Sequence, residues 1–184
     1  KRLTEEEGCD YVLMQLETNS GAVYDVAEHA ALNGKRVILN PAPAAAVPEH
    51  VWKWIDIVTP NEVEAEYYTG IPVCSGESAE EAAQWFHRRG VRHVIITMGD
   101  SGAYLSVNGA GQMVPPFCVT AVDTTGAGDA FNGGLLAALS EGKDLTQAVV
   151  FASAAAALSV GRIGTAPSMP EREEILSLLK TVRK

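Results

Sequence analysis

Asp123-Thr-Thr-Gly-Ala-Gly-Asp129 runs directly into Ala130-Phe-Asn-Gly-Gly-Leu-Leu-Ala137, a turn of small residues followed by an apolar helical pattern. Residues 126–128 have little or no side chain, so their backbone N–H groups can approach an anion closely. The helix that follows adds its own unpaired N–H groups and the positive end of its dipole. Asp129 stands in the first turn, where it can accept a proton from a hydroxyl held beside the anion. The stretch therefore predicts transfer of a phosphoryl group to an alcohol.

A small-residue turn before a helix also occurs in many α/β proteins. A lone Gly-x-Gly would not distinguish an anion-binding turn from such an ordinary helix start. The sequence contains no Gly-x-x-x-x-Gly-Lys-Ser/Thr motif, so a Walker-type phosphate loop is excluded. No Gly-x-Gly-x-x-Gly follows the first apolar run, which makes a dinucleotide-dependent dehydrogenase a distant alternative.

Composition and charge narrow the class of protein. The chain has 184 residues, enough for one sizeable core, and its net charge of -9 argues against nucleic-acid or anionic-membrane partners. Its apolar stretches are much shorter than a membrane span, and no signal peptide opens the chain. Cys9, Cys74 and Cys118 are scattered without metal-ligand spacing, as free thiols in a reducing cytoplasm would be.

Apolar runs alternate with helical patterns, which is typical of βα units with a mainly parallel sheet. We expect one α/β domain covering residues 1–184. The predicted strands are Cys9–Leu16, Arg36–Asn40, Ile55–Thr59, Val94–Thr97, Ala103–Val107 and, after a hairpin turn at Asn108–Gly111, Gln112–Val114. The predicted helices with both bounds given are Ser20–Asn33, a short turn at Pro48–Trp54, Gly128–Ser140, Leu145–Val160 and Pro170–Val182, the last after a cap at Ser168. Two further helices are predicted between them. One is capped by Asn61, and the other begins with a capping box at Ser78–Glu81 and ends at Gly90.

Every position from Asp123 to Leu136 fits the C-terminal signature of the ribokinase (PfkB) family of sugar and nucleoside kinases, which this chain resembles. The resemblance implies a three-layer α/β fold and ATP-dependent phosphorylation of a sugar hydroxyl. Further matching pieces favour D-ribose over the substrates of fructokinase-like or adenosine kinase-like members, which remain the alternative. These pieces are Met14-Gln-Leu-Glu17, Asn40-Pro-Ala-Pro-Ala44, Thr59-Pro-Asn-Glu62 and Thr97-Met-Gly-Asp-Ser-Gly102.

The resemblance also implies roles for single residues. Asp129 would be the catalytic base, and Glu17 would hydrogen-bond sugar hydroxyls from the carboxyl end of a predicted strand. A solvent-exposed loop glutamate is the alternative for Glu17. The amides that would stabilise charge on the transferred phosphoryl group belong to Gly126, Ala127 and Gly128. The implied ATP-binding residues are Asn61, Thr97, Met98, Gly99, Asp100, Ser101, Gly102, Gly128 and Ser153.

Two residues are implied at a magnesium site. Asn61 and Glu64 lie three positions apart at a helix start, so both can face the same side. By resemblance they organise Mg²⁺ and its waters, with Glu64 as the metal-side residue, and Mg²⁺ needs few protein oxygens. Both also suit a helix N-terminus on local grounds, as cap and as dipole partner.

The segment from Ser159 to Ser168 resembles the loop that surrounds a monovalent cation in the family. Backbone carbonyls and hydroxyls suit K⁺, which is large and weakly hydrated. The alternative is a plain loop between two helices. The implied ligands are the Asp123 carboxylate, the Ser168 hydroxyl and the carbonyls of Thr125, Ser159, Arg162 and Gly164.

The beginning of the sequence indicates a piece of a larger protein. It has no initiating Met, and Lys1–Gly8 has the pattern of a helix tail. The family's Gly-Gly-Lys-Gly-Ala-Asn sugar motif and β lid, which belong to its N-terminal half, do not occur in this sequence. We expect a C-terminal portion that binds ATP and sugar and forms a homodimer when complete. A nucleotide-binding fragment with no activity of its own is the other hypothesis.

Overall fold

The computed structural model describes residues 9–182, so the expectation for Lys1–Gly8 lies outside the described residues. The chain forms two compact units. Unit 1 runs through Met98 and includes Tyr104–Met113, and unit 2 comprises Gly99–Ala103 and the residues from Val114 onward. The single domain expected from the sequence therefore stays a prediction, and each unit is described by itself.

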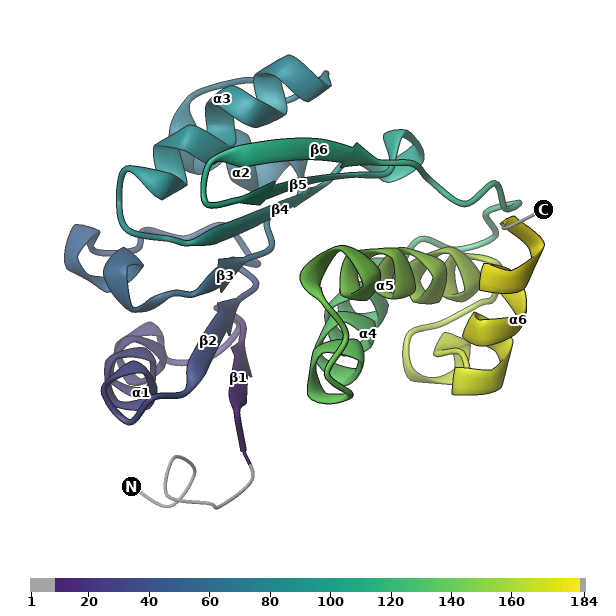
Figure 1. Cartoon of the computed structure of the whole chain (residues 1–184), viewed down its shortest axis with the longest axis horizontal. Coiled ribbons are helices and arrows are strands. Elements are labelled where there is room, and N and C mark those ends of the chain that lie inside the picture. Colours follow the sequence, from purple (N-terminus) through teal and green to yellow (C-terminus); the bar gives the residue numbers. More distant parts are fainter. Residues whose placement is uncertain (1–8, 183–184) are drawn as a thin grey trace. The chain divides into compact units, whose positions relative to one another are not determined.

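Unit 1 is built on a sheet with the strand order β1-β2-β3-β4-β5-β6 over the described residues (Figure 1). The first four strands pair in parallel, with Leu13 opposite Ile38 and Ile57 opposite His93. The last two form a hairpin through Asn108 and Gly109, whose φ angles of 50° and 87° suit a two-residue turn. The strands are β1 (Tyr11–Met14), β2 (Arg36–Leu39), β3 (Ile57–Val58), β4 (His93–Thr97), β5 (Ala103–Val107) and β6 (Ala110–Val114).

The helices of unit 1 pack their apolar faces on the sheet in one continuous core. Trp52 is 1% exposed and forms edge-to-face contacts with Tyr68, Trp85 and Phe86. Such aromatic pairs stabilise a core beyond their buried area, so this cluster joins three helical segments behind the sheet. The helical segments are α1 (Ser20–Leu32), the 3₁₀ turn η1 (Glu49–Trp54), α2 (Glu62–Thr69) and α3 (Gly76–His87).

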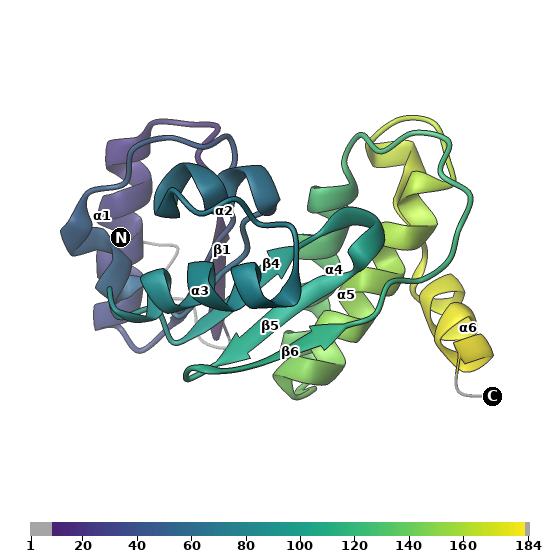
Figure 2. The ribbon, with the colours of Figure 1, turned by 90° about the horizontal axis from the view of Figure 1, so that it is seen from above.

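Unit 2 is mainly helical, and α4 and α5 lie side by side in it (Figure 2). A Cβ atom added to Gly134 would lie 3.0 Å from Ala155 Cβ and 3.1 Å from Ala152 Cα, so the two helices pack too closely for a side chain there. The elements of this unit are η2 (Gly99–Ser101), α4 (Ala127–Ser140), α5 (Leu145–Val160), η3 (Ala166–Ser168) and α6 (Arg172–Val182).

The α/β class, with a mainly parallel sheet flanked by helices, is confirmed.

Two helix caps predicted from the sequence, at Ser78 and Ser168, are wrong. Helix α3 begins at Gly76 rather than after Ser78 and ends at His87 rather than Gly90. The cap is Ser75, which accepts the Ser78 N–H while Ser78 Oγ accepts the Ser75 N–H at 2.9 Å, so the reciprocal box closes one turn earlier. Ser168 does not cap α6, because its hydroxyl donates to Thr165 O at 2.6 Å inside η3.

Within residues 9–182 we find no helix with the length and apolar character needed to cross a membrane.

Candidate active site

In unit 2, α4 begins without a side-chain cap. Its N-cap is Gly126, which has a φ of 79° and no side chain to accept the N–H groups of the first turn. A Cβ atom at Gly126 would lie 3.3 Å from Thr165 Cγ2, whereas Gly128 has open space around it. An exposed helix start whose N–H groups lack a side-chain cap, with small residues around it, can bind an anion.

Asp129 lies in the first turn of α4 and is exposed. A carboxylate there is favourably placed against the helix dipole and stands next to the N–H groups of the same turn. Asn132, only 4% exposed, donates from Nδ2 to Gly128 O at 2.9 Å and so holds the backbone one residue before Asp129. The local arrangement suits a base beside a bound anion.

Asp123 links the glycine turn to a distant loop of unit 2. Its Oδ2 accepts the Gly164 N–H at 3.0 Å, and its Oδ1 accepts the Thr125 N–H at 2.9 Å. The hydrogen bonds from Gly164 and Thr125 lower the pKa of Asp123 to about 2. Val160 O accepts the N–H groups of both Val122 and Asp123, at 2.7 and 3.1 Å. The structure thus brings Asp123 and Thr125 together with Gly164, which lies 41 residues after Asp123 in the sequence.

The other residues proposed for the cation loop differ in their surroundings. Ser159 and Ser168 are 1% and 0% exposed, and their hydroxyls donate to Ala156 O and Thr165 O. The Arg162 side chain pairs with Glu174 on α6, which leaves only its backbone carbonyl for the expected role. Ser153, expected at the nucleotide, lies half-buried within α5.

In unit 1, Asn61 and Glu64 close a complete capping box at the start of α2. Asn61 Oδ1 accepts the Glu64 N–H at 2.8 Å, and Glu64 Oε2 accepts the Asn61 N–H at 2.9 Å. Glu64 is 8% exposed, and burial raises its pKa although the Asn61 N–H opposes this shift. Asn61 also forms a parallel bridge with Thr97, whose N–H donates to Pro60 O at 3.0 Å. Three of the expected site residues therefore meet at the carboxyl ends of β3 and β4.

The loop after β4 contains the other residues expected at the nucleotide. Met98 is buried, while Gly99, Asp100 and Ser101 are exposed. A Cβ atom at Gly102, whose φ is 92°, would lie 2.2 Å from Val114 O, so only glycine fits there. This loop therefore brings its backbone against another strand end, which was not foreseen from the sequence.

Glu17, expected at the sugar, is exposed in the loop after β1. The preceding residue, Leu16, is 6% exposed and its N–H donates to Ala42 O at 2.8 Å, so the loop is fixed just before Glu17. The sequence did not single out Asn40 as a candidate site residue, although its side-chain amide is buried just after β2. The available signal was a polar residue directly after an apolar strand.

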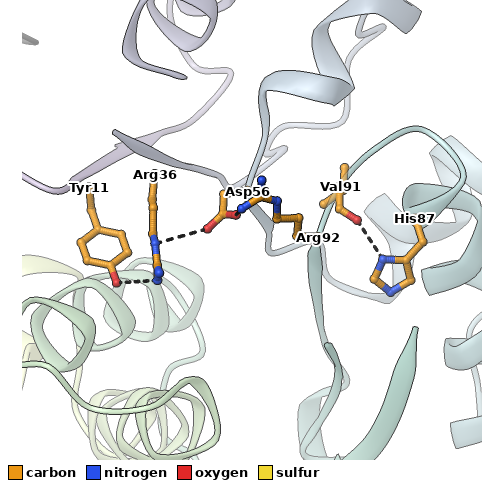
Figure 3. Close-up of polar contacts among 6 residues, drawn as sticks. All are labelled: Tyr11, Arg36, Asp56, His87, Val91 and Arg92. Atoms are coloured by element: carbon orange, nitrogen blue, oxygen red, sulfur yellow. Dashed lines mark hydrogen bonds and ion pairs between the residues drawn. The ribbon is translucent and has the colours of Figure 1, made fainter. Parts of the chain in front are cut away.

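A separate polar cluster lies at the amino ends of the strands (Figure 3). Arg36 Nη1 donates to Tyr11 Oη at 3.0 Å, and Asp56 lies 4.0 Å from Arg36 Nε and 3.8 Å from Arg92 Nη1. In the same view, His87 Nδ1 lies 2.8 Å from the Val91 carbonyl oxygen. Asn61 and Thr97, which are expected at the nucleotide, lie at the opposite, carboxyl ends of the strands. The polar cluster is therefore not part of the candidate active site, and we interpret it as a structural link between neighbouring strands.

Comparison with known proteins identifies the family. The model of the pfkB family of carbohydrate kinases matches residues 7–172, so the chain belongs to that family. A ribokinase from Haemophilus influenzae is 46% identical over 171 residues, which cover 93% of this chain and 56% of that protein.

Solved structures agree with this family assignment. A structure of Arabidopsis thaliana ribokinase complexed with ribose and ATP has a TM-score of 0.88 at 35% identity, covering 93% of this chain and 56% of that one. An E. coli structure in complex with ATP and Mg²⁺, 26% identical, has a TM-score of 0.78 and covers 94% of this chain and 59% of that one. The chain spans about half the length of the relatives it matches.

Proposed function

We propose that this chain is the nucleotide-binding and catalytic part of an ATP-dependent sugar kinase that phosphorylates the primary hydroxyl of D-ribose. The uncapped start of α4, with Asp129 in its first turn, is the observation that carries the proposal. Membership of a carbohydrate kinase family supports the reaction class. Similarity to ribokinases, including one complexed with ribose and ATP, supports the substrate.

In the proposed reaction, Asp129 accepts the proton of the sugar hydroxyl as the sugar oxygen attacks the γ-phosphorus of ATP. The bond from the γ-phosphorus to the β–γ bridging oxygen breaks, and ADP leaves. The N–H groups of residues 126–128 stabilise the charge on the phosphoryl group while it moves. Because these donors belong to the backbone, they need little rearrangement before the reaction. The Ala127 N–H, which donates to Thr124 O at 3.2 Å, must exchange that hydrogen bond for one to the phosphoryl group. Glu17 orients the sugar, and the loop from Thr97 to Gly102 contacts the nucleotide.

The metal requirement is proposed from the donors in unit 1. Among the described residues, no three His, Cys, Asp or Glu side chains are arranged to hold a metal ion. Asn61 and Glu64 offer oxygens at one helix start, which suits Mg²⁺ because this ion keeps most of its waters and binds phosphates. A bound Mg²⁺ would supply positive charge to the phosphates, with Asn61 and Glu64 holding it or its waters. The similar E. coli structure in complex with ATP and Mg²⁺ supports a requirement for this ion.

A monovalent cation is proposed between Asp123 and the loop from Ser159 to Ser168. The donors there are oxygens, and the two hydrogen bonds of Asp123 leave further lone pairs on its carboxylate. A K⁺ ion would fix the shape of the turn and raise the rate without contacting ATP. Replacing K⁺ by Li⁺ at constant ionic strength should lower the rate, and equal rates would contradict the site.

The substrate is tested by phosphate transfer from ATP·Mg²⁺ in the complete protein. D-Ribose should be phosphorylated faster than fructose or 2-deoxyribose at equal concentration. 5-Deoxyribose, which lacks the accepting hydroxyl, is the matched control and should give only background ATP hydrolysis. Equal turnover with 5-deoxyribose, or a clear preference for another sugar, would overturn the assignment to ribose.

A nucleotide-binding fragment without activity is the second candidate, because the chain spans about half the length of its relatives. Calorimetric titration of the 184-residue chain with ATP·Mg²⁺ and with ribose distinguishes the two. Nucleotide binding without ribose binding supports the fragment, and turnover by the chain alone excludes it. The family resemblance also supports a homodimer of the complete protein, which its mass in solution tests.

A further inference from the structure

A buried amide joins three loops at the carboxyl edge of the unit 1 sheet. Asn40 follows β2 directly and is 6% exposed. Its Nδ2 donates to Thr59 O, after β3, at 2.9 Å, and its Oδ1 accepts from Gln15 Nε2, after β1, at 3.1 Å. Its backbone N–H donates to Met14 O at the end of β1 at 2.9 Å, so its backbone binds the neighbouring strand while its side chain binds the loops on either side.

The orientation of this amide follows from its partners. The carbonyl of Thr59 can only accept a hydrogen bond, so the nitrogen of the Asn40 side chain must face it. The oxygen then faces Gln15, whose Nε2 donates. Asn40 therefore needs one donor and one acceptor, in fixed positions, in a place with little access to water. A carboxylate has the same shape but offers no donor to Thr59 O.

The two loops that Asn40 joins lead to different parts of the candidate site. Glu17, the expected sugar residue, comes two positions after Gln15, and Leu16 between them is buried. Asn61, the expected phosphate-side residue, comes two positions after Thr59, which is 2% exposed, and is itself bridged to Thr97. The segments before Glu17 and before Asn61 are thus tied to a single side chain.

We propose that Asn40 is a positioning residue for phosphoryl transfer, which fixes the sugar-side loop after β1 relative to the phosphate-side loop after β3. This inference rests on the proposed function. Transfer needs the hydroxyl and the phosphate in a narrow range of mutual positions, and a small displacement is costly. Loss of the link should therefore lower kcat more than it changes the KM for ATP.

The test is the pH profile of an Asn40→Asp variant of the complete protein. Where the introduced carboxyl is ionised, it faces Thr59 O without a proton to donate, and kcat should fall about 10- to 100-fold. As the pH falls and this carboxyl becomes protonated, its O–H can donate to Thr59 O while its other oxygen accepts from Gln15. The ratio of variant to wild-type kcat should therefore rise toward one at low pH. An Asn40→Leu variant should show no such recovery.

Two further variants keep the inference falsifiable. Ser106→Ala removes a buried hydrogen bond to His87 Nε2, 2.8 Å long, in the same unit, and should lower thermal stability with kcat unchanged. Gln15→Met removes the hydrogen bond from Gln15 Nε2 to Asn40 Oδ1 and keeps the bond from Asn40 to Thr59 O, so it should lower kcat, but less than Asn40→Asp does. This variant still tests the inference if Asn40→Asp folds poorly. A kcat ratio for Asn40→Asp that does not depend on pH, or unchanged kcat in Gln15→Met, overturns the inference. A wild type that transfers no phosphate overturns the proposed function instead.

Discussion

The helices α2 and α4 both begin at residues expected to act on ATP, yet their first turns differ. Helix α2 is closed by its own side chains, because Asn61 and Glu64 accept each other's N–H groups. Helix α4 begins at Gly126 in a left-handed conformation, and no side chain caps it. A side-chain cap typically contributes about 0.5–2 kcal/mol of stability, which α4 lacks.

The difference separates two ways of acting on phosphate. The capping box at the start of α2 uses the N–H groups of Asn61 and Glu64, so fewer backbone donors remain there and we expect this helix to act mainly through side chains and a metal. The start of α4 lacks a side-chain cap, and we expect the Gly126 and Gly128 N–H groups to bind the ligand first, because the Ala127 N–H donates to Thr124 O at 3.2 Å. Local irregularity of this kind, in an otherwise well-packed helix pair, is expected where a protein binds its ligand. Each prediction below changes one side of this comparison.

The largest effect is expected from Asp129→Asn, which removes the proposed base at the open helix. Turnover in the complete protein should fall about 10²- to 10⁴-fold, because general base catalysis contributes about that much, while nucleotide binding persists. The matched control is Asp144→Asn at the start of α5. Asp144 Oδ1 accepts the Gln147 N–H at 2.8 Å, and asparagine caps helices equally well, so turnover should not change. Near-normal turnover in Asp129→Asn would remove the base assignment.

The second prediction concerns the open first turn itself. Gly128→Ala places a methyl group where the phosphate is expected, and should raise the KM for ATP about tenfold or more. Gly133→Ala, further along α4, is the control, since a Cβ atom at either glycine meets no atom within 4 Å. Both substitutions should stabilise the helix, by up to about 1 kcal/mol, because alanine has the higher helix propensity. Steady-state kinetics and thermal unfolding measure the two effects, and equal KM values in the two variants would count against phosphate binding at this turn.

A smaller effect is expected at the capped helix. Glu64→Gln keeps an oxygen that can accept the Asn61 N–H, so the capping box should persist. Because burial raises the pKa of Glu64, removing its charge should leave stability unchanged or increase it. The Mg²⁺ concentration for half-maximal rate should rise about tenfold, as for other residues that orient metal-bound water. Glu66→Gln, exposed two residues later on a different face of the helix, is the control, and identical Mg²⁺ curves for both variants would argue against a metal role.

The smallest effect is a pH dependence of stability from Asp123. Its pKa is lowered to about 2 in the folded chain, so its ionised form stabilises the fold above pH 4, near the ordinary pKa of this group. This contribution should disappear as the pH falls through about 2. Denaturant unfolding of wild type and Asp123→Asn between pH 6 and 2 measures it. The difference between the two proteins should shrink toward low pH, and a constant difference would contradict the account.

The sequence predicted most elements because their periodicity and stop residues are local. Helix α5 has the predicted bounds, and Gly34 follows α1 with a φ of 74°. The start of α3 was predicted wrongly because Ser75 and Ser78 both fit a cap, and only the reciprocal hydrogen bonds decide between them.

Contacts between distant residues were harder to predict. The link from Asp123 to Gly164 could be expected only through family resemblance, since no local pattern joins them. Asn40 was missed as a functional residue because its role depends on Gln15 and Thr59, which lie in two other loops. Side chains that act through loops of other strands carry no periodic signal in the sequence.

The central claim is that the phosphates of ATP bind the backbone amides at the open start of α4, whereas the capped start of α2 acts on them through side chains and Mg²⁺. Backbone amide NMR of the complete protein, titrated with ATP·Mg²⁺, tests it most directly. The account predicts that the amide signals of residues 126–129 shift most, with slower exchange of their hydrogens with solvent. If those amides stay unchanged at saturation while the amides of residues 62–65 shift, the claim is contradicted.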